Sequence, residues 1–290
     1  MNALGSIGAT VAEKLATSLA WQSFAALAVL FLAVLAVEGM KGRKPSRYLE
    51  RSFYTDIVYT ALIVGGAYAW LQQPVVNWVD TQLRLHAPFL FTDLLRGVPE
   101  PLQLIVFLIA VDLCRYWKHR AMHAFPALRA IHGVHHAPEN LNLLTTYRVH
   151  LFEYILDGIA TLVPVVILGL PPEMWLPVYL GLTLLSALNH SDIDLDFGWL
   201  NRIIVSPRFH ATHHSSDRRE YDSNYAALFS FWDVLFGTAT FRQSRPERYG
   251  LSKLHMPPSF TGQLLFPVGH MARRLRRSRS AGRRDEVPQR

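Results

Sequence analysis

The segment WQSFAALAVLFLAVLAVEGM, residues 21–40, carries no charged side chain between Trp21 and Val37. That run is just long enough to cross a hydrocarbon core of roughly 30 Å as a helix. It is longer than the apolar core of a signal peptide, no charged stretch directly precedes it, and the basic segment KGRKPSR follows at 41–47. We therefore expect a retained transmembrane helix here.

Weaker apolar segments recur along the chain, which is 50% hydrophobic and has a mean hydropathy of +0.15. This composition lies above the usual soluble range. The sequence predicts an all-α integral-membrane protein with four or five transmembrane helices and a cytoplasmic helical cap. The further expected spans are 55–73, 101–117, 154–170 and 173–189.

We expect three regions along the chain. Residues 1–100 form an N-terminal membrane region with two spans, 101–240 a catalytic domain, and 241–290 a basic tail that is largely disordered at its end. The only cysteine, Cys114, lies inside an expected span, which excludes an intrachain disulfide and a cysteine-based metal site. Any metal must be held by histidine and carboxylate side chains.

Basic residues set the predicted topology, because cytoplasmic loops carry an excess of Lys and Arg. The tail ARRLRRSRSAGRR at 272–284 belongs in the cytoplasm, and so does the cluster after the first span, Lys41, Arg43, Lys44, Arg47 and Arg51. Both histidine clusters described below then lie on the cytoplasmic side. The net charge of +7 is concentrated in these flanks, which favours anionic lipid over nucleic acid as the partner. An amino-acid composition rich in Ala, Leu and Arg favours a location of the protein in a bacterial inner membrane.

Two segments repeat an H-x-x-H-H spacing, HGVHH at 132–136 and HATHH at 210–214, and His119 and His123 precede the first one. Residues three and four apart share a helix face, so each triplet is expected to present its rings in one direction. Pro126 should end the first helix, a short helix should carry 132–136, and Ser206-Pro207 should open a third. Neutral imidazoles are common metal ligands, and eight or more exceed what one ion takes, which indicates two metal ions.

The residues between His119 and His123 decide which chemistry is favoured. The H-E-x-x-H pattern of zinc hydrolases supplies a glutamate base, whereas Arg, Ala and Met stand here. Activation of O₂ against a lipid C–H bond fits this ligand set better. A zinc-dependent membrane hydrolase and a non-enzymatic haem- or metal-binding membrane protein remain the alternatives. A dinucleotide fingerprint is absent, so electrons should come from a separate carrier.

Several segments in this order resemble the fatty acid hydroxylase/sterol desaturase superfamily of histidine-rich membrane di-iron oxygenases. They are DLCRYWKHRAMH (112–123), HGVHH (132–136), LNHSD (188–192), SPRFHATHH (206–214) and DSNYAALFSFWDVLFGT (222–238).

The resemblance implies two iron ions, for which zinc is a possible substitute, and O₂ as co-substrate. It implies hydroxylation or desaturation of a sterol, fatty acyl chain or related lipid, with a cytochrome b5-like or ferredoxin-type donor and its reductase. His150, in RVHLFE, is either a ligand or a residue that supports one. The implied ligand set is His119, His123, His132, His135, His136, His150, His190, His210, His213 and His214.

Acidic and aromatic residues near these histidines are further candidates. Asp112 and Tyr116 lie at helical spacing from His119 and could line the substrate path or orient a ligand. The alternative for Asp112 is a simple pair with Arg115. Four aspartates could accept the second ring N–H of a ligand or cap turns: Asp192, Asp194, Asp196 and Asp217. His86, His255 and His270 stand apart and are expected to be ordinary surface residues.

Overall fold

The computed structural model describes residues 20–40, 48, 50–169, 175–252 and 254–285. Within these residues the fold is helical, as predicted, and the only β pairing is an isolated bridge between Ser215 and Tyr249. The α-helices are α2 (Ala20–Met40), α3 (Arg51–Val64), α4 (Ala67–His86), α5 (Glu100–Ala124), α6 (Pro126–His132), α7 (Leu151–Leu168), α8 (Trp175–His190), α9 (Pro207–His213), α10 (Phe231–Leu235) and α11 (Phe260–Asp285). Short 3₁₀ helices are η3 (Pro88–Leu90), η4 (Leu143–Tyr147) and η6 (Gly198–Arg202).

The segment 55–73, expected as one span, is divided between two helices and is not one continuous helix. Helix α3 ends at Val64, and α4 begins at Ala67. Gly66 between them has a φ of 84°, a left-handed conformation that glycine adopts without strain. A Cβ atom on Gly65 would collide with the carbonyl of Ala61. The two adjacent glycines therefore permit a break that hydropathy alone does not reveal.

Among the described residues, one helix is both long and apolar enough to cross a membrane. It is Leu151–Leu168, with a mean hydropathy of 1.9, and 22% of it is buried. Helix α2 contains a shorter apolar stretch, Ala28–Val37. The basic residues at 41–47 and the start of the fifth expected span at 173–174 lie outside the described residues.

Helix ends around the histidine segments follow the sequence signals in part. Helix α5 ends at Ala124, before Pro126, as predicted. Ser206 caps α9 by accepting a hydrogen bond from the Phe209 N–H, also as predicted. The helix expected over 132–136 differs: α6 ends at His132, and the following residues form turns with the bonds Val134 N–H to Ile131 O and His135 N–H to His132 O.

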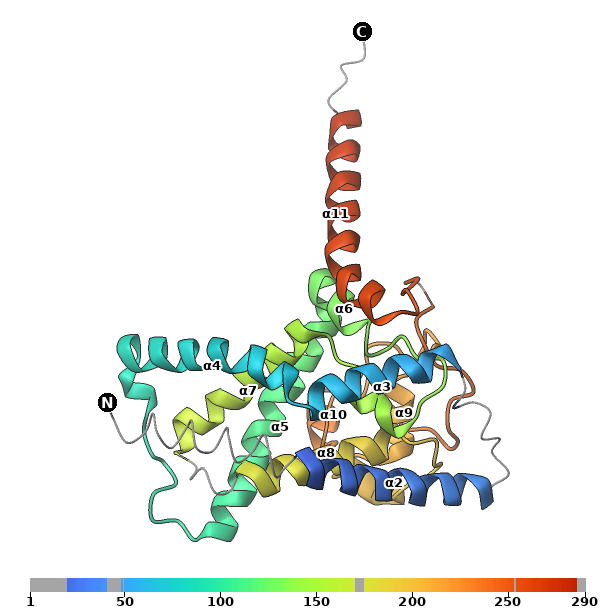
Figure 1. The fold of residues 1–290 in the computed structure, drawn as a ribbon. Coiled ribbons are helices and arrows are strands. Elements are labelled where there is room, and N and C mark those ends of the chain that lie inside the picture. The colour runs from blue at the N-terminus through green and yellow to red at the C-terminus, as the bar shows by residue number, and fades with distance from the viewer. Residues whose placement is uncertain (1–19, 41–47, 49, 170–174, 253, 286–290) are drawn as a thin grey trace.

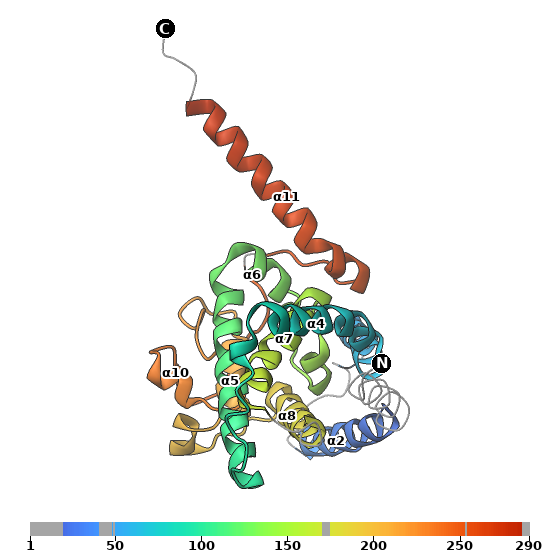
Figure 2. The ribbon, with the colours of Figure 1, turned by 90° about the vertical axis from the view of Figure 1, so that its left-hand side faces the viewer.

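Helix α7 packs against both α5 and α4, and α2 lies beside α8 in both views (Figure 1, Figure 2). The α2–α8 contact contains a buried cluster of Val34, Leu143 and Ala187. Helix α11 extends away from this body as a long rod (Figure 2). The sequence predicted a tail that is disordered towards its end, whereas the structure continues as helix to Asp285. Arg, the commonest residue of this helix, is a good helix former.

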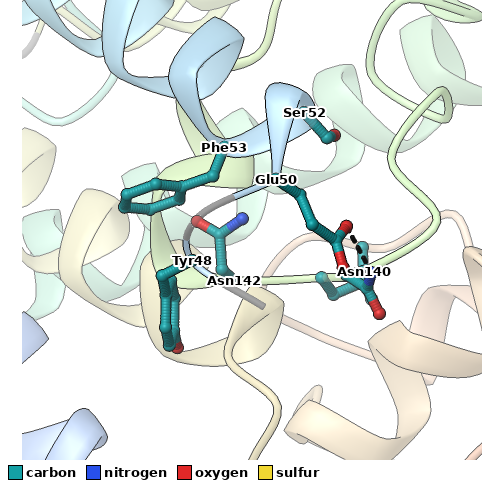
Figure 3. A pocket seen from close by; sticks show the side chains of 7 residues that line it. Tyr48, Glu50, Ser52, Phe53, Asn140 and Asn142 are labelled. Atoms are coloured by element: carbon teal, nitrogen blue, oxygen red, sulfur yellow. Dashed lines mark hydrogen bonds between the residues drawn. The ribbon is translucent and has the colours of Figure 1, made fainter. Parts of the chain in front are cut away.

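The start of α3 is held against the segment that follows the first histidine triplet. A small pocket of about 10 Å³ lies there. Asn140 donates to the Glu50 carboxylate at 2.8 Å beside it (Figure 3). Deeper, Asp56 is fully buried, forms an ion pair with Arg148 at 2.9 Å and accepts a hydrogen bond from Asn142 at 2.8 Å. These contacts fix η4 and the residues next to it, which support one of the histidine groups.

Candidate metal centre

Nine histidines from α5, α6, α8, α9 and the turns that follow α6 and α9 form two groups. In each group one nitrogen of every ring lies within 4.8 Å of the others. The five-histidine group contains His119, His123, His132, His136 and His213. The four-histidine group contains His135, His190, His210 and His214.

Each H-x-x-H-H triplet contributes to both groups, so the expectation that its rings share one direction is wrong. His132 and His136 enter the five-histidine group, whereas His135 enters the four-histidine group. In the second triplet the assignment is reversed: His210 and His214 join the four-histidine group, and His213 joins the other. Positions i and i+4 lie about 40° apart around a helix, but i+3 and i+4 differ by about 100°. In the second triplet, which lies on α9, His213 therefore points to the neighbouring group.

The tautomers of the five-histidine group follow from its hydrogen bonds. The Nδ1 atoms of His119 and His213 lie 2.7 Å from the carbonyl oxygens of Tyr225 and Ser223. A carbonyl oxygen only accepts, so each Nδ1 carries the proton and each Nε2 keeps a lone pair. His132 likewise donates from Nδ1 to Glu153 Oε1 at 2.8 Å.

Lone pairs consequently converge in this group. The Nε2 atoms of His119 and His132 are 2.9 Å apart, and neither ring has a proton left to place between them. The Nε2 atoms of His123 and His213 are buried and have no hydrogen-bond partner. Facing lone pairs and unpartnered buried nitrogens are costly unless a cation lies among them.

The four-histidine group has the same character. His190 donates from Nδ1 to the Ser186 carbonyl at 2.7 Å, and His135 donates to the Arg148 carbonyl at 3.2 Å. Their Nε2 atoms, both without protons, are 3.1 Å apart. His210 Nε2 lies 2.9 Å from His190 Nε2 and 3.2 Å from His214 Nε2. This group also gathers ring nitrogens around one point.

Burial keeps the rings neutral, because desolvation disfavours the imidazolium form. It lowers the pKa of His135 to about 3 and that of His190 to about 4, and it holds the pKa values of the other buried rings below the ordinary value. Neutral, convergent, unpartnered nitrogens are the donor set that first-row metal ions bind. The residues therefore fit one metal ion in each group.

Two carboxylates that the sequence analysis did not select support the five-histidine group. Glu153 accepts from His132, and Asp222 lies 3.2 Å from His123 Nδ1 while pairing with Arg129. Such carboxylates orient a ligand ring and raise its basicity. The sequence did contain one signal for Glu153, which is an acidic residue in the first turn of the apolar helix α7. Burying a carboxylate in such a place costs free energy unless it has a partner. Nothing in the local sequence separates Asp222 from the other aspartates.

Each of the four aspartates named from the sequence forms an ion pair with an arginine. Asp194 and Asp196 form ion pairs with Arg208, Asp192 pairs with Arg245, and Asp217 pairs with Arg219. Asp196 and Asp217 also accept backbone N–H groups two residues ahead, which is the turn-capping alternative. Among the described residues, both histidine groups consist of histidines alone, and neither includes a carboxylate.

His150 lies outside both groups, unlike the ligand role that the resemblance suggested. Its Nδ1 accepts the N–H of Phe152 at 3.2 Å and thereby caps α7. Its Nε2 donates to the Leu264 carbonyl at 3.0 Å. Because both ring nitrogens have protein partners, neither has a lone pair directed at a histidine group. His86, His255 and His270 also lie outside the two groups, as expected.

Asp112 and Tyr116 hold the segment that carries the carbonyl partner of His119. The buried Asp112 carboxylate accepts the N–H groups of Leu228 and Phe229 at 2.9 and 2.8 Å. The Tyr116 hydroxyl lies 2.8 Å from Thr238 Oγ1. Both residues therefore hold in place the segment on which Tyr225 lies.

Comparison with known proteins matches these residues to a family model. Residues 104–238 match the family model described as fatty acid hydroxylase. The chain is 27% identical to an ornithine lipid hydroxylase of Rhizobium tropici over 81% of its own length and 71% of the relative's. It is 33% identical to a methylsterol monooxygenase of Aspergillus fumigatus over 50% of this chain and 49% of that protein. It is 32% identical to human alkylglycerol monooxygenase over 45% of this chain and 29% of that enzyme.

No solved structure matches the chain. The matched family segment contains every member of both histidine groups. The resemblance read from the sequence motifs is confirmed by the match of residues 104–238 to the fatty acid hydroxylase model.

Proposed function

We propose that this chain is a membrane-bound, O₂-dependent lipid oxygenase that holds one iron ion in each histidine group. The observation that carries the proposal is the convergence of neutral imidazole lone pairs at two adjacent points. The prediction of an oxygenase acting on lipids is confirmed by the family match and by the lipid oxygenases among the relatives.

Nine of the ten ligands named from the sequence would hold the metal, all except His150. Iron bound there would supply the redox chemistry that activates O₂ against a C–H bond, and zinc would be a substitute without redox activity. The protein keeps each ring neutral by burial and fixes its tautomer through a carbonyl or carboxylate on Nδ1. It thereby presents preformed nitrogen ligands and excludes bulk water from the centre.

A membrane lipid is the proposed substrate, as the names of all three relatives suggest. An open apolar groove of about 740 Å³ runs between α2 and α8, lined by Ala25, Val29, Leu30, Ala33, Leu184, Leu185 and Leu188. Leu188 is two residues before His190 on the same helix. We propose that the hydrocarbon chain of the lipid lies in this groove and reaches the four-histidine group at its end.

The membrane arrangement is also a proposal. We propose four or five spans with the histidine groups in a cytoplasmic helical cap, in a bacterial inner membrane. The expected regions 1–100, 101–240 and 241–290 are retained as membrane part, catalytic domain and basic tail. Electrons would come from a separate cytochrome b5-like or ferredoxin-type carrier with its reductase.

The test compares lipids from cells that express the wild-type chain, His135→Ala, His213→Ala or the control His255→Ala. A lipid that gains one oxygen or loses two hydrogens should appear with the wild type and the control only. The same extracts distinguish hydroxylation from desaturation. Purified protein should contain two iron ions per chain. Unchanged lipids together with zinc that cannot be exchanged for iron would refute the proposed oxygenase.

A further inference from the structure

A chain of oxidisable aromatic rings leads from the five-histidine group to the protein surface. The Tyr225 ring lies against three members of the group, with centroid distances of 5.2 Å to His123, 5.6 Å to His119 and 6.0 Å to His213. Tyr116 follows at 6.0 Å from Tyr225. Trp117 follows at 5.6 Å from Tyr116, and its side chain is 48% exposed.

Phenol and indole rings are the protein side chains, besides sulfur groups, that lose one electron most readily. Steps of this length between neighbouring rings allow fast electron transfer. Phe236 packs against both Tyr116 and Trp117, and its ring is far harder to oxidise. The relay is therefore confined to Tyr225, Tyr116 and Trp117.

Tyrosine oxidation requires an acceptor for the phenol proton, and the structure provides one for Tyr116. Arg120 can only donate to the Tyr116 hydroxyl, which it approaches at 3.3 Å. Thr238 donates its own hydroxyl proton to Asp233 Oδ1 at 2.7 Å. The Tyr116 hydroxyl must consequently donate to Thr238 Oγ1, at 2.8 Å.

The hydrogen-bond direction from Tyr116 through Thr238 to Asp233 is therefore fixed. Asp233 is fully buried, and burial raises the pKa of its carboxyl, which makes it a readier proton acceptor than an exposed aspartate. Asp233 also accepts the N–H groups of Tyr225 and Ala226 and so stays in place. Electron and proton leave Tyr116 by separate routes.

We propose that Tyr225, Tyr116 and Trp117 form a relay that removes oxidising equivalents from the metal centre when no lipid is present to react. The relay rests on the proposed oxygenase function, because the oxidant is the iron centre after it has reduced O₂. It protects the histidine ligands, which would otherwise be the nearest oxidisable groups.

Each passage transfers one electron. Tyr116 gives one electron to the oxidised centre by tunnelling past the Tyr225 ring, which is not itself oxidised. The phenol proton of Tyr116 moves to Thr238 while the Thr238 proton moves to Asp233. Trp117 then gives one electron to the Tyr116 phenoxyl radical, which recovers its proton along the same bonds. The oxidised Trp117 releases its indole proton to water. A small reductant at the surface, ascorbate in the assay, returns one electron, and water returns the proton.

The test uses iron-loaded protein without lipid, reduced anaerobically and then mixed with O₂. Peptide mass spectrometry measures oxygen addition at Trp117 and at Trp199, which is 72% exposed and serves as the control. Diffusing oxidants would favour the more exposed Trp199, whereas the relay favours Trp117 by at least several-fold. Ascorbate should suppress the Trp117 product.

Two variants test the order of the relay while iron content is measured in each. Tyr116→Phe should abolish the preference for Trp117 and leave Trp199 unchanged. Trp117→Phe should remove the residue that reduces the Tyr116 radical. A tyrosyl radical signal should then persist longer in freeze-quench electron paramagnetic resonance. The relay would be overturned if oxygen addition at Trp117 and Trp199 simply followed the exposed fraction of each side chain. It would also be overturned if Tyr116→Phe, at full iron content, gave the same amount of the Trp117 product as the wild type.

Failure of the proposed function has a different signature. An iron-loaded protein that does not consume O₂ would contradict the oxygenase. In that case hydrogen peroxide supplies the oxidising equivalents to the same iron, and the comparison of Trp117 with Trp199 still decides for or against the relay.

Discussion

His132 and Glu153 form a hydrogen bond of 2.8 Å between Nδ1 and Oε1, and each side chain is only 4% exposed. This contact joins the first histidine triplet to the apolar helix α7. It sets the tautomer of His132 and supplies the negative charge nearest to the five-histidine group. Lys118 lies 3.5 Å from the same oxygen and 2.7 Å from Asp157, so the carboxylate is itself held by charge.

Glu153→Gln should weaken metal binding in the five-histidine group by about 10- to 100-fold, because the ligand ring loses its anionic partner. The four-histidine group should keep its ion. Metal titration followed by elemental analysis measures both. Asp157→Asn is the matched control, since Asp157 contacts Lys118 but no histidine ring. Equal metal loss in both variants would contradict the role of Glu153.

A second prediction follows because each triplet contributes histidines to both groups. His213→Ala should deplete the five-histidine group, although His213 lies in the second triplet, and His135→Ala should deplete the four-histidine group. Mössbauer spectra of ⁵⁷Fe-loaded variants should lose different iron components. If His213→Ala and His214→Ala removed the same component, the triplets would be separate half-sites, as the spacing first suggested.

His150→Ala should keep both metal ions, because neither ring nitrogen points to a histidine group. The variant removes the side-chain cap of α7, which costs about 1 kcal/mol of unfolding free energy. Thermal unfolding measures this loss, and elemental analysis measures the metal. His190→Ala provides the comparison, since it should lose metal. Metal loss in His150→Ala comparable to that in His190→Ala would restore the ligand role that the resemblance implied.

Local signals predicted the parts of the site that depend on local structure. The end of α5 before Pro126 and the Ser206 cap involve neighbours only a few residues away, and the metal-ligand chemistry followed from the histidine spacing. The partners of the rings could not be predicted in this way. Glu153 is 21 residues from His132, and Asp222 is 99 residues from His123, so only the tertiary fold brings them together.

The break at Gly65–Gly66 escaped prediction for a different reason. Both glycines lie in an apolar run, and hydropathy does not register whether a residue can adopt a positive φ. In the first triplet the directions of His135 and His136 are set by the turns that follow the end of α6 at His132. Element boundaries of this kind are set by tertiary contacts as well as by local sequence.

The groove between α2 and α8 provides the last prediction. Ala33 lines it from α2, opposite Leu184, Leu185 and Leu188 of α8. Ala33→Trp should fill much of the space for a hydrocarbon chain and lower lipid oxidation at least tenfold, while both metal ions and the fold remain. Ala33→Val is the control, because a small apolar side chain leaves most of the groove open and should keep activity within a few-fold of the wild type. Lipid oxidation in membranes, iron content and thermal unfolding are measured together. Full activity in a folded, iron-loaded Ala33→Trp variant would show that the lipid reaches the centre by another path.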